Sequence, residues 1–534
     1  MTAAAVPPAP QQRPMLGPTL GPMLAPWPKL DGLRAYIGIL GVLLGALVST
    51  LGARATTFGL ADLRGGLHAG FDEGAWITTA YGVGQMVVGV ACPYLGIVFG
   101  ARRVLFAGIG LFFVASLLAP LSPNLTAYLA MQFLSGVGGG TFIPLTIRFI
   151  VLNLPARLTL YGLAAYAMNS EFSQNIGAAL EGWYAENWSI AWLNWQYCLV
   201  LPVMFLCVWI GVPREPVNTD LLKQHDGPGV AYAGVGFGLL YAGLDQGNRL
   251  DWTRNGLVVG LLVAGAIVTA LFAVRELVVS RRPFLNLRLM LRANLLLLML
   301  LLAGFRFIIL STAYIIPLYL QVVQNFRELQ VGPVLLFIAL PQFALILPLA
   351  WVLARVDGRW VLAAGALLIA IACWQATALT SLWATWDFLP SQALQAVGQC
   401  LALTALVVLV VRNITPADAI SIGALMQTAR LFGGEIGVAF MQTFVRTREQ
   451  LHSNLLGLHV DPLSGATADR LARYQAALAP HMDDPVGGAA QLLAGRVAQQ
   501  ASVLAYIDGF AAAAVGALVC ILLAAWLRPP AAKA

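Results

Sequence analysis

The feature that most constrains this chain is the recurrence of apolar stretches of about 20 residues, from Leu33 almost to the C-terminus. A helix of that length crosses the hydrocarbon core of a bilayer, which is about 30 Å thick. In lipid every backbone polar group must be bonded within its own segment, and the runs lack the alternation of barrel strands, so they predict helices. We therefore expect an all-α polytopic membrane protein. The fourteen predicted spans are residues 35–60, 75–98, 103–121, 126–152, 159–185, 190–212, 228–246, 255–278, 293–322, 331–354, 360–381, 388–411, 418–444 and 505–527.

The composition excludes several classes of protein. Hydrophobic residues make up 59% of the chain and charged residues only 10%, where a soluble domain uses about 25%. The net charge of +7 does not indicate a nucleic-acid partner, because the basic residues lie mostly between apolar runs. The six cysteines fall in or beside apolar stretches without a CxxC pair, and the five histidines are scattered. We therefore predict no metal, no cofactor and no enzymatic activity, since a membrane enzyme needs clustered His, Asp or Cys.

The distribution of basic residues predicts the orientation in the membrane. More than half of the 31 Lys and Arg residues fall on the segments that are cytoplasmic if the N-terminus is cytoplasmic. We therefore expect both termini in the cytoplasm, with residues 1–32 as a disordered tail rich in Pro and Gly. The segment 446–504 is then external, and its apolar spacing predicts two or three amphipathic helices. Such a segment is either a contact surface or a solvated connection between two spans.

Ionisable residues at membrane depth are the strongest functional signal, because burying a charge in a bilayer is costly. Glu171 is followed by Gln174 and Asn175 at three and four positions, which predicts a polar helix face turned toward protein or a water-filled cavity. A desolvated carboxyl there can carry a proton, although Glu171 could instead only pair with Arg54 or Arg148. The seven such residues are Arg54, Arg148, Glu171, Glu181, Arg306, Arg430 and Glu435.

Helical geometry separates the roles of the others. Glu181 lies ten residues after Glu171, about 15 Å along the helix, so we expect it near the outer end and wetter, as a weaker candidate for proton coupling. Glu435 lies about 140° around the helix from Arg430, so the two should not share a face. Arg430 is a candidate either for function or for a clamp between helices, and Arg148 either reaches the cavity or snorkels to the cytoplasmic surface.

Small-residue faces predict closely packed helices. The run Gly136, Gly138, Gly139 and Gly140 is unlike a nucleotide-binding loop because no strand precedes it, so we read it as a packing face. Gly177 in the fifth span and Gly433 and Gly434 in the thirteenth have the same character, and we assign them a gating or structural role together with Arg102 and Arg103. Helices that approach closely can rock or slide, which is typical of transporters.

Four stretches carry a resemblance to a known family. They are GAWITTAYGVG (74–84), SGVGGGTFIPL (135–145), LDQGNRLDW (244–252) and ARLFGGEIGVAF (429–440). With the fourteen spans and the long loop before the last span, the sequence resembles the fourteen-spanner drug:proton antiporters of the major facilitator superfamily, most closely the EmrB type. The resemblance runs from about residue 35 to 527.

The resemblance implies a fold and partners. It implies two six-helix bundles, 33–212 and 293–534, with two inserted helices in 213–292, and alternating access about a midplane cavity lined by spans 1, 4, 9 and 12. It also implies a bacterial inner membrane, a periplasmic membrane-fusion adaptor (EmrA-like) docking on 446–504, and an outer-membrane channel. The family's charged gating motif is degenerate at 93–103, and the acid of the family's first span falls on Gly52, so the usual acidic handle of a cation pump is missing.

These observations lead to a functional hypothesis. Three cavity-side arginines against one buried glutamate favour an anion, because a guanidinium in low dielectric attracts carboxylates and phosphates. We expect proton-driven export of amphipathic or aromatic organic compounds that carry an anionic group. The alternatives are a multidrug pump for hydrophobic cations and neutral compounds, or an uptake symporter. The predicted proton-coupling residues are Glu171, Glu435 and Glu181, and the predicted substrate-binding residues are Arg54, Arg306, Arg148, Gln174 and Asn175.

Overall fold

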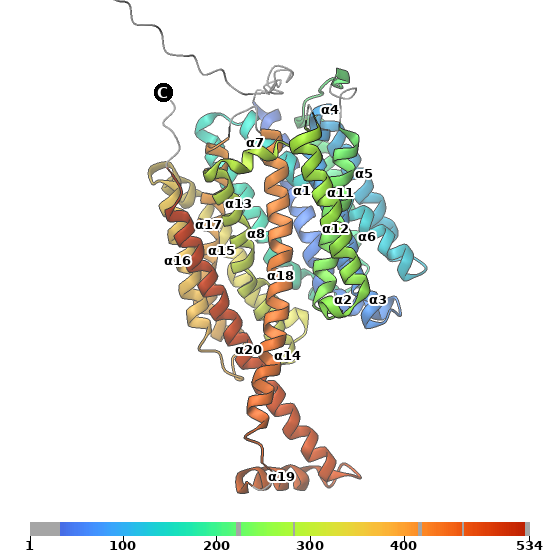
Figure 1. Cartoon of the computed structure of the whole chain (residues 1–534), viewed down its shortest axis with the longest axis vertical. Coiled ribbons are helices and arrows are strands. Elements are labelled where there is room, and N and C mark those ends of the chain that lie inside the picture. Colours follow the sequence, from blue (N-terminus) through green and yellow to red (C-terminus); the bar gives the residue numbers. More distant parts are fainter. Residues whose placement is uncertain (1–31, 221–225, 281–282, 415–418, 462–463, 529–534) are drawn as a thin grey trace, which may run out of the picture.

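The computed structural model describes residues 32–220, 226–280, 283–414, 419–461 and 464–528, and its regular structure in these ranges is helical. Almost all of the predicted N-terminal tail, residues 1–32, lies outside the described residues. Long helices run side by side along the long axis of the molecule, and two of them continue beyond the rest at one end (Figure 1).

The helices follow the predicted spans in order. The first part of the chain forms α1 (Leu33–Phe58), α2 (Leu60–Gly66), α3 (Phe71–Gly74), α4 (Trp76–Val98), α5 (Ala101–Leu118), η2 (Ala119–Leu121), α6 (Leu125–Gly140), α7 (Phe142–Asn153), α8 (Ala156–Asn187) and α9 (Trp192–Gly211). The middle part forms α11 (Gly227–Gly247), η3 (Trp252–Arg254), α12 (Gly256–Val274), η4 (Arg275–Val279) and η5 (Leu287–Leu291). The last part forms α13 (Ala293–Ile308), η6 (Ser311–Ile315), α14 (Ile316–Val322), α15 (Glu328–Arg355), α16 (Gly358–Ala376), η7 (Thr385–Phe388), α17 (Leu389–Arg412), α18 (Ala419–Gly457), α19 (Gly465–Leu478) and α20 (Pro485–Ala525).

The number of membrane crossings is only partly supported. Among the described residues, eleven helices are long and apolar enough to cross a membrane. The three other predicted spans correspond to α8, α11 and α18, which are helical but more polar or richer in glycine. All predicted spans therefore lie on helices, whereas the count of fourteen crossings stays a prediction.

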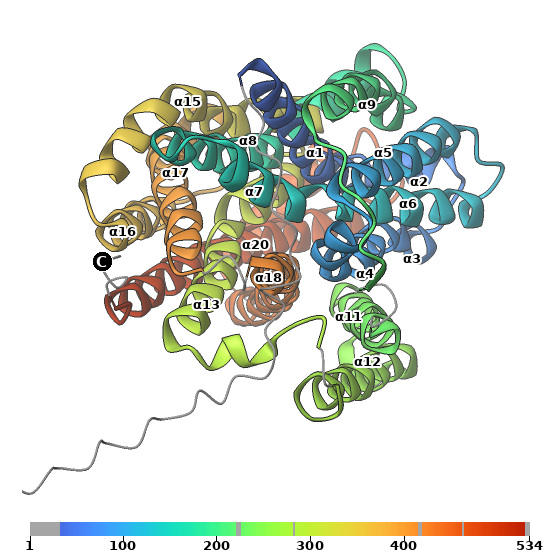
Figure 2. The ribbon, with the colours of Figure 1, turned by 90° about the horizontal axis from the view of Figure 1, so that it is seen from above.

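The helices pack around one central region. Viewed along the long axis, α1, α4, α5, α6 and α9 lie on one side, α13, α15, α16, α17 and α20 lie on the other, and α7 and α8 lie between them (Figure 2). Helices α11 and α12 pair at the edge beside α4. The two sides meet where α8 packs on α15 and where α4 packs on α18. The inserted pair thus contacts the centre through α11, which touches both α4 and α18. The exact domain boundaries stay a prediction.

The glycine run of the fourth span holds α6 against α4, as predicted. A Cβ atom on Gly136 would lie 2.1 Å from the Tyr81 carbonyl oxygen, and one on Gly140 would lie 2.7 Å from that of Gln85. On the neighbouring face, a Cβ atom on Gly138 would lie 2.7 Å from the Gly108 carbonyl oxygen of α5. The backbones therefore approach as closely as only glycine permits.

The segment 446–504 is more continuous than predicted. Helices α18 and α20 simply extend out of the bundle, and α19 is the one separate helix at the tip within the described residues (Figure 1). We call residues 446–504 the hairpin. Asp508 ties its base together, because the carboxylate accepts a hydrogen bond from Arg448 Nε at 2.6 Å and contacts His452 Nε2 at 2.7 Å.

We predict that Gly136→Ala destabilises the protein. The added methyl group meets backbone rather than a flexible side chain, so α4 and α6 must separate, at a cost of about 1–3 kcal/mol. Gly110→Ala on α5 is the matched control, since a Cβ atom there meets nothing within 4 Å. The measurement is the thermal midpoint in detergent, and equal midpoints for the two variants would contradict the packing described here.

Candidate functional site

A cavity of about 760 Å³ lies between the two sides of the molecule. Its lining comes from α1, α4, α8, α11, α13, η6 and α18, with α2, α3 and α14 at one end. Phe71, which is 69% exposed, and Arg249 and Arg446 belong to this lining. They lie at the end of the bundle that carries the hairpin, so the cavity is open toward the hairpin (Figure 1).

The opposite end of the cavity is closed by contact between α4 and α18. A Cβ atom on Gly89 would lie 3.0 Å from Gln427 Cγ, and one on Gly423 would lie 3.4 Å from Pro93 Cγ. The deepest polar lining includes Ser49, which accepts a hydrogen bond from Gln85 Nε2 at 2.8 Å. Within the described residues, α4 and α18 therefore close the cavity at this end.

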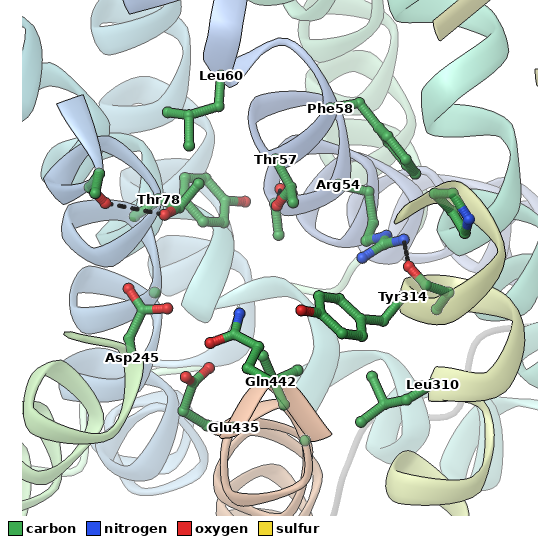
Figure 3. A pocket seen from close by; sticks show the side chains of 18 of the residues that line it. Arg54, Thr57, Phe58, Leu60, Thr78, Asp245, Leu310, Tyr314, Glu435 and Gln442 are labelled. Atoms are coloured by element: carbon green, nitrogen blue, oxygen red, sulfur yellow. Dashed lines mark hydrogen bonds between the residues drawn. The ribbon is translucent and has the colours of Figure 1, made fainter. Parts of the chain in front are cut away.

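Arg54 is held in place by backbone carbonyls. Its Nη2 donates to the Ala313 carbonyl oxygen at 2.8 Å and its Nε to that of Gln174 at 3.3 Å, and Figure 3 shows the guanidinium facing η6. Ala313 lies in a π-helical turn four residues before Pro317, which has no N–H to donate to that carbonyl. The proline and the π-helix thus leave an acceptor for the arginine, as π-helical turns often do at functional sites.

Two further arginines reach the same cavity. Arg306 Nη2 donates to Gln174 Oε1 at 3.5 Å, and Arg430 Nε donates to Gln427 Oε1 at 3.2 Å. The buried Arg306 Nε and Arg430 Nη2 have no hydrogen-bond partner in the described part of the chain. These N–H groups are available to an acceptor that enters the cavity.

Glu171 lies behind this group of arginines. Its side chain is 1% exposed, and neither carboxylate oxygen has a hydrogen-bond partner among the described residues. Arg306, Arg430 and Arg54 attract it electrostatically, so of its two predicted partners Arg54 acts on it. Its predicted proton-carrying role stays a prediction.

The wall beside α11 is acidic. Asp245 of α11 and Glu435 of α18 both point into the cavity (Figure 3). The Thr79 hydroxyl donates to Asp245 Oδ2, while the Tyr241 hydroxyl hydrogen-bonds Glu435, which is 7% exposed. In this view Arg54 lies across the cavity from Asp245, so the cavity has a basic side and an acidic side.

The expected lining helices are only partly correct. The lining contains no residue of the fourth or twelfth span among the described residues. The glycine run places α6 behind α4, and Gln395 and Gln399 of α17 bond to Ser311 and Thr312 of η6, which places α17 behind η6. Likewise Arg430 and Glu435 both line the cavity, although we expected them to face apart, because the cavity is wide enough to span both faces of α18.

Sequence reasoning missed Asp245 and Tyr241 as site residues. Asp245 directly follows an apolar run that ends at Leu244, and it resembles an ordinary loop acid. Gly82 is the sequence feature that corresponds to Tyr241, because a Cβ atom on Gly82 would lie 2.3 Å from the Tyr241 ring. This glycine lets α11 pass its side chains between α4 and α18.

Besides Glu171, three predicted coupling or substrate-binding residues lie outside the cavity lining. Arg148 interacts electrostatically with Glu215 and Cys92 toward the closed end, so it is not brought to this cavity. Asn175 donates to the Glu171 carbonyl oxygen at 2.8 Å and faces away. Glu181 lies near the open end as expected, but it is 0% exposed rather than wet, because Asp62, Glu328 and Leu193 surround it.

Predicted gating and structural residues have identifiable contacts. Arg102 stacks over Phe106 and Trp209 at 5.4 and 5.0 Å from the ring centroids. Arg103 donates to the Phe99 and Glu215 carbonyl oxygens at 2.8 and 3.0 Å, which ties α5 to the segment after α9. Outside the helices, burial raises the pKa of the Glu215 carboxyl, an effect that the Arg148 charge opposes.

The three glycines pack at helix crossings. A Cβ atom on Gly177 would lie 3.1 Å from Arg54 Cβ, and one on Gly433 would lie 2.5 Å from Ala303 Cβ. Gly434 lies beside the Arg306 guanidinium and leaves room for it. Whether these positions move during a gating step stays a prediction.

No group of three or more His, Cys, Asp or Glu able to hold a metal occurs in the described ranges.

Comparison with known proteins identifies relatives along most of the chain. The chain is 23% identical to the colistin resistance protein EmrB of Acinetobacter baumannii, over 81% of this chain and 85% of the relative. It is 24% identical to the multidrug export protein EmrB of Haemophilus influenzae and 20% identical to that of Escherichia coli, in both cases over 82% of this chain and 85% of the relative.

Solved structures match the fold. The proton:xylose symporter XylE aligns with a TM-score of 0.53 at 13% identity, over 90% of this chain and 94% of that structure. An auto-inhibited peptide transporter of the POT family aligns with a TM-score of 0.55 at 15% identity, over 94% and 99%. The family model of the Major Facilitator Superfamily matches residues 42–438. The helical architecture, the central cavity and this match together show that the chain belongs to the major facilitator superfamily, as a multi-pass membrane transporter rather than an enzyme.

Proposed function

We propose that this transporter exports amphipathic or aromatic organic compounds that carry an anionic group, in exchange for protons. The observation that supports this most directly is the set of three guanidiniums, Arg54, Arg306 and Arg430, on one cavity, with Glu171 as the carboxylate that acts on all three among the described residues. A carboxylate or phosphate entering the cavity would meet unbonded N–H groups and an unbalanced positive charge.

The rest of the lining fits an amphipathic body. Phe58, Leu310 and Tyr314 lie around Arg54 (Figure 3), and Leu318 and Val438 also line the cavity. Sites for small molecules are commonly apolar with a few polar groups that fix orientation. An aromatic compound with one acidic group therefore matches the composition of this wall.

The direction of transport rests on orientation and on relatives. The distribution of basic residues favours cytoplasmic termini in a bacterial inner membrane. The cavity would then be open to the outside, in the state that releases an exported compound. The relatives named above are export or resistance proteins, which supports export by this chain.

Of the predicted proton carriers, Glu435 is the one that reaches the cavity.

A second candidate function is a multidrug pump for hydrophobic cations. Asp245 and Glu435 favour it, since two carboxyl groups on one wall attract a cationic group. Binding of matched anionic and cationic probes separates the two functions.

We predict that Arg306→Ala weakens the binding of Nα-dansyl-norleucine, an aromatic carboxylate, by about ten- to a hundredfold. Losing a hydrogen bond to a charged group costs about 1.5–3 kcal/mol. Arg306→Lys should lose less because it keeps the charge. The measurement is dansyl fluorescence with the purified protein in lipid nanodiscs.

Arg103→Ala is the control, because Arg103 is an arginine outside the cavity. If Arg306→Ala binds the probe as well as the wild-type protein does, the anion site is not here. If dansylcadaverine binds and Nα-dansyl-norleucine does not, the cation pump is the better description.

We predict that a disulfide between Gly89→Cys and Gln427→Cys stops transport by holding the cavity open toward the hairpin. Alternating access requires α4 and α18 to separate at this contact. In a background without the six native cysteines, oxidation should abolish dansyl-probe transport in proteoliposomes and reduction should restore it. Each single variant should be insensitive to oxidation. Unimpaired transport by the cross-linked protein would contradict a moving contact.

We also propose that the hairpin binds a periplasmic membrane-fusion adaptor, which leads to an outer-membrane channel. Several apolar side chains on it are exposed, including Leu458 at 79% and Val486 at 63%. Groups of exposed apolar side chains outside the membrane often mark contact surfaces, whereas single scattered ones do not.

We predict that Leu458→Ser with Val486→Ser abolishes export from whole cells but leaves transport in proteoliposomes intact. Only the first assay needs the adaptor and the channel. Leu382→Ser is the control, since Leu382 is 84% exposed in the loop between α16 and η7 and does not belong to the hairpin residues 446–504. A loss of transport in both assays would place the defect in the transporter, and no loss in either would remove the hairpin from docking.

A further inference from the structure

The two acidic residues of the cavity wall occupy an unusual position. Asp245 comes from the inserted helix α11, and Glu435 faces it from α18 (Figure 3). Glu435 is 7% exposed, and its Oε1 has no hydrogen-bond partner in the described part of the chain. No ion pair of either residue is found among the described residues. A nearly buried carboxyl that faces a cavity and forms no ion pair lacks a partner, which a ligand could supply.

The surroundings of the pair are largely uncharged. On α4 the nearest polar group is the Thr79 hydroxyl, and on α11 they are Tyr241 and Gln246. Arg249 attracts Asp245, but it already forms an ion pair with Asp72. Arg306 of α13 acts on Tyr241. Among the described residues, no other charged group acts on the pair as strongly, and Asp245 and Glu435 repel each other.

Two facing carboxylates are stabilised by one positive charge between them. That charge is either a proton shared by the pair or a cationic group of the substrate, and the two exclude each other. Binding of an ammonium group therefore expels the proton from the carboxyl O–H to water in the open cavity. Competition of this kind is what exchange of substrate for proton requires.

Protonation of Glu171 affects substrate binding in the opposite direction. When ionised it competes with an anionic substrate for Arg306, Arg430 and Arg54, so its protonation favours binding of the anion. A carboxyl coupled in that way would move the proton and the anion in the same direction. Glu171 therefore fits the role of counter-charge in the empty cavity rather than that of the exchange site.

We propose that Asp245 and Glu435 form an exchange site that holds either a proton or an amine of the substrate, so that the preferred substrates carry both an anionic group and an amine. This inference rests on the proposed function, because the arginines must hold the anionic group on the other side of the cavity. It also gives the inserted helix α11 a role in coupling.

The test uses three matched probes on the purified full chain in lipid nanodiscs. Nα-dansyl-lysine carries a carboxylate and an ammonium, Nα-dansyl-norleucine lacks the ammonium, and dansylcadaverine lacks the carboxylate. We expect Nα-dansyl-lysine to bind about tenfold more tightly than either of the others. In weakly buffered solution with a pH dye, both amine probes should release a proton on binding, and their binding should weaken as the pH falls. Nα-dansyl-norleucine should release none.

The variants separate the roles of the two sides. Asp245→Asn and Glu435→Gln should each reduce the preference for Nα-dansyl-lysine over Nα-dansyl-norleucine from about tenfold to about one, and should abolish proton release. Tyr241→Phe is a milder variant in case either substitution impairs folding, which thermal melting checks, and it should reduce the preference in the same direction. Asp251→Asn is the matched control, because Asp251 follows α11, pairs with Arg446 and is absent from the lining.

The possible failures are distinguishable. Equal binding of Nα-dansyl-lysine and Nα-dansyl-norleucine without proton release, with Arg306→Ala still weakening both, would overturn this inference and leave the anion site. Loss of proton release in Glu171→Gln but not in Asp245→Asn would also overturn it. Insensitivity of all three probes to Arg306→Ala would instead overturn the proposed function.

Discussion

The cost of holding charge inside a bilayer governs the centre of this protein. Three guanidiniums and three carboxyl groups, those of Glu171, Asp245 and Glu435, lie within or beside one cavity where the dielectric constant is low. They are tolerable only because the cavity admits water from one end and because backbone carbonyls and amides satisfy part of their hydrogen bonds. Arg54, which bonds to two carbonyl oxygens on different helices, shows how much of the fold serves to hold one such charge.

Close helix packing makes this arrangement possible. Gly136 and Gly140 bring α6 onto α4, and Gly82 lets Tyr241 of α11 pass between α4 and α18. Gly89 and Gly423 bring α4 and α18 together at the other end. The same two helices therefore separate around the acidic wall and touch at the end away from the hairpin, which closes the cavity there. The inserted helix thereby becomes part of the cavity wall.

Much of this could be predicted from the sequence, and the exceptions have physical reasons. Every predicted apolar span lies on a helix, because length and hydropathy are local properties. Arg54, Arg306 and Arg430 could be recognised as functional candidates because a charge in an apolar run is conspicuous. Asp245 could not, because its position near a helix end makes it look solvated, and its neighbours on α4 and α18 are distant in sequence.

The exposure of a side chain to water was also poorly predicted from its position along a helix. Glu181 lies where the count placed it, but packing against α2 and α15 excludes the water that we expected there. Arg148 lies on a helix adjacent to the centre but toward the closed end, so the cavity does not include it. Contacts between distant helices decide these outcomes, and no single segment encodes them.

The central claim is that the arginine side of the cavity binds the anionic group of the substrate. The most direct measurement is an electron cryomicroscopy structure of the protein in nanodiscs with bound Nα-dansyl-lysine. The account predicts the carboxylate within hydrogen-bonding distance of Arg306 or Arg54 and the ammonium beside Asp245 and Glu435. A ligand bound in the reverse orientation, or outside this cavity, would contradict it.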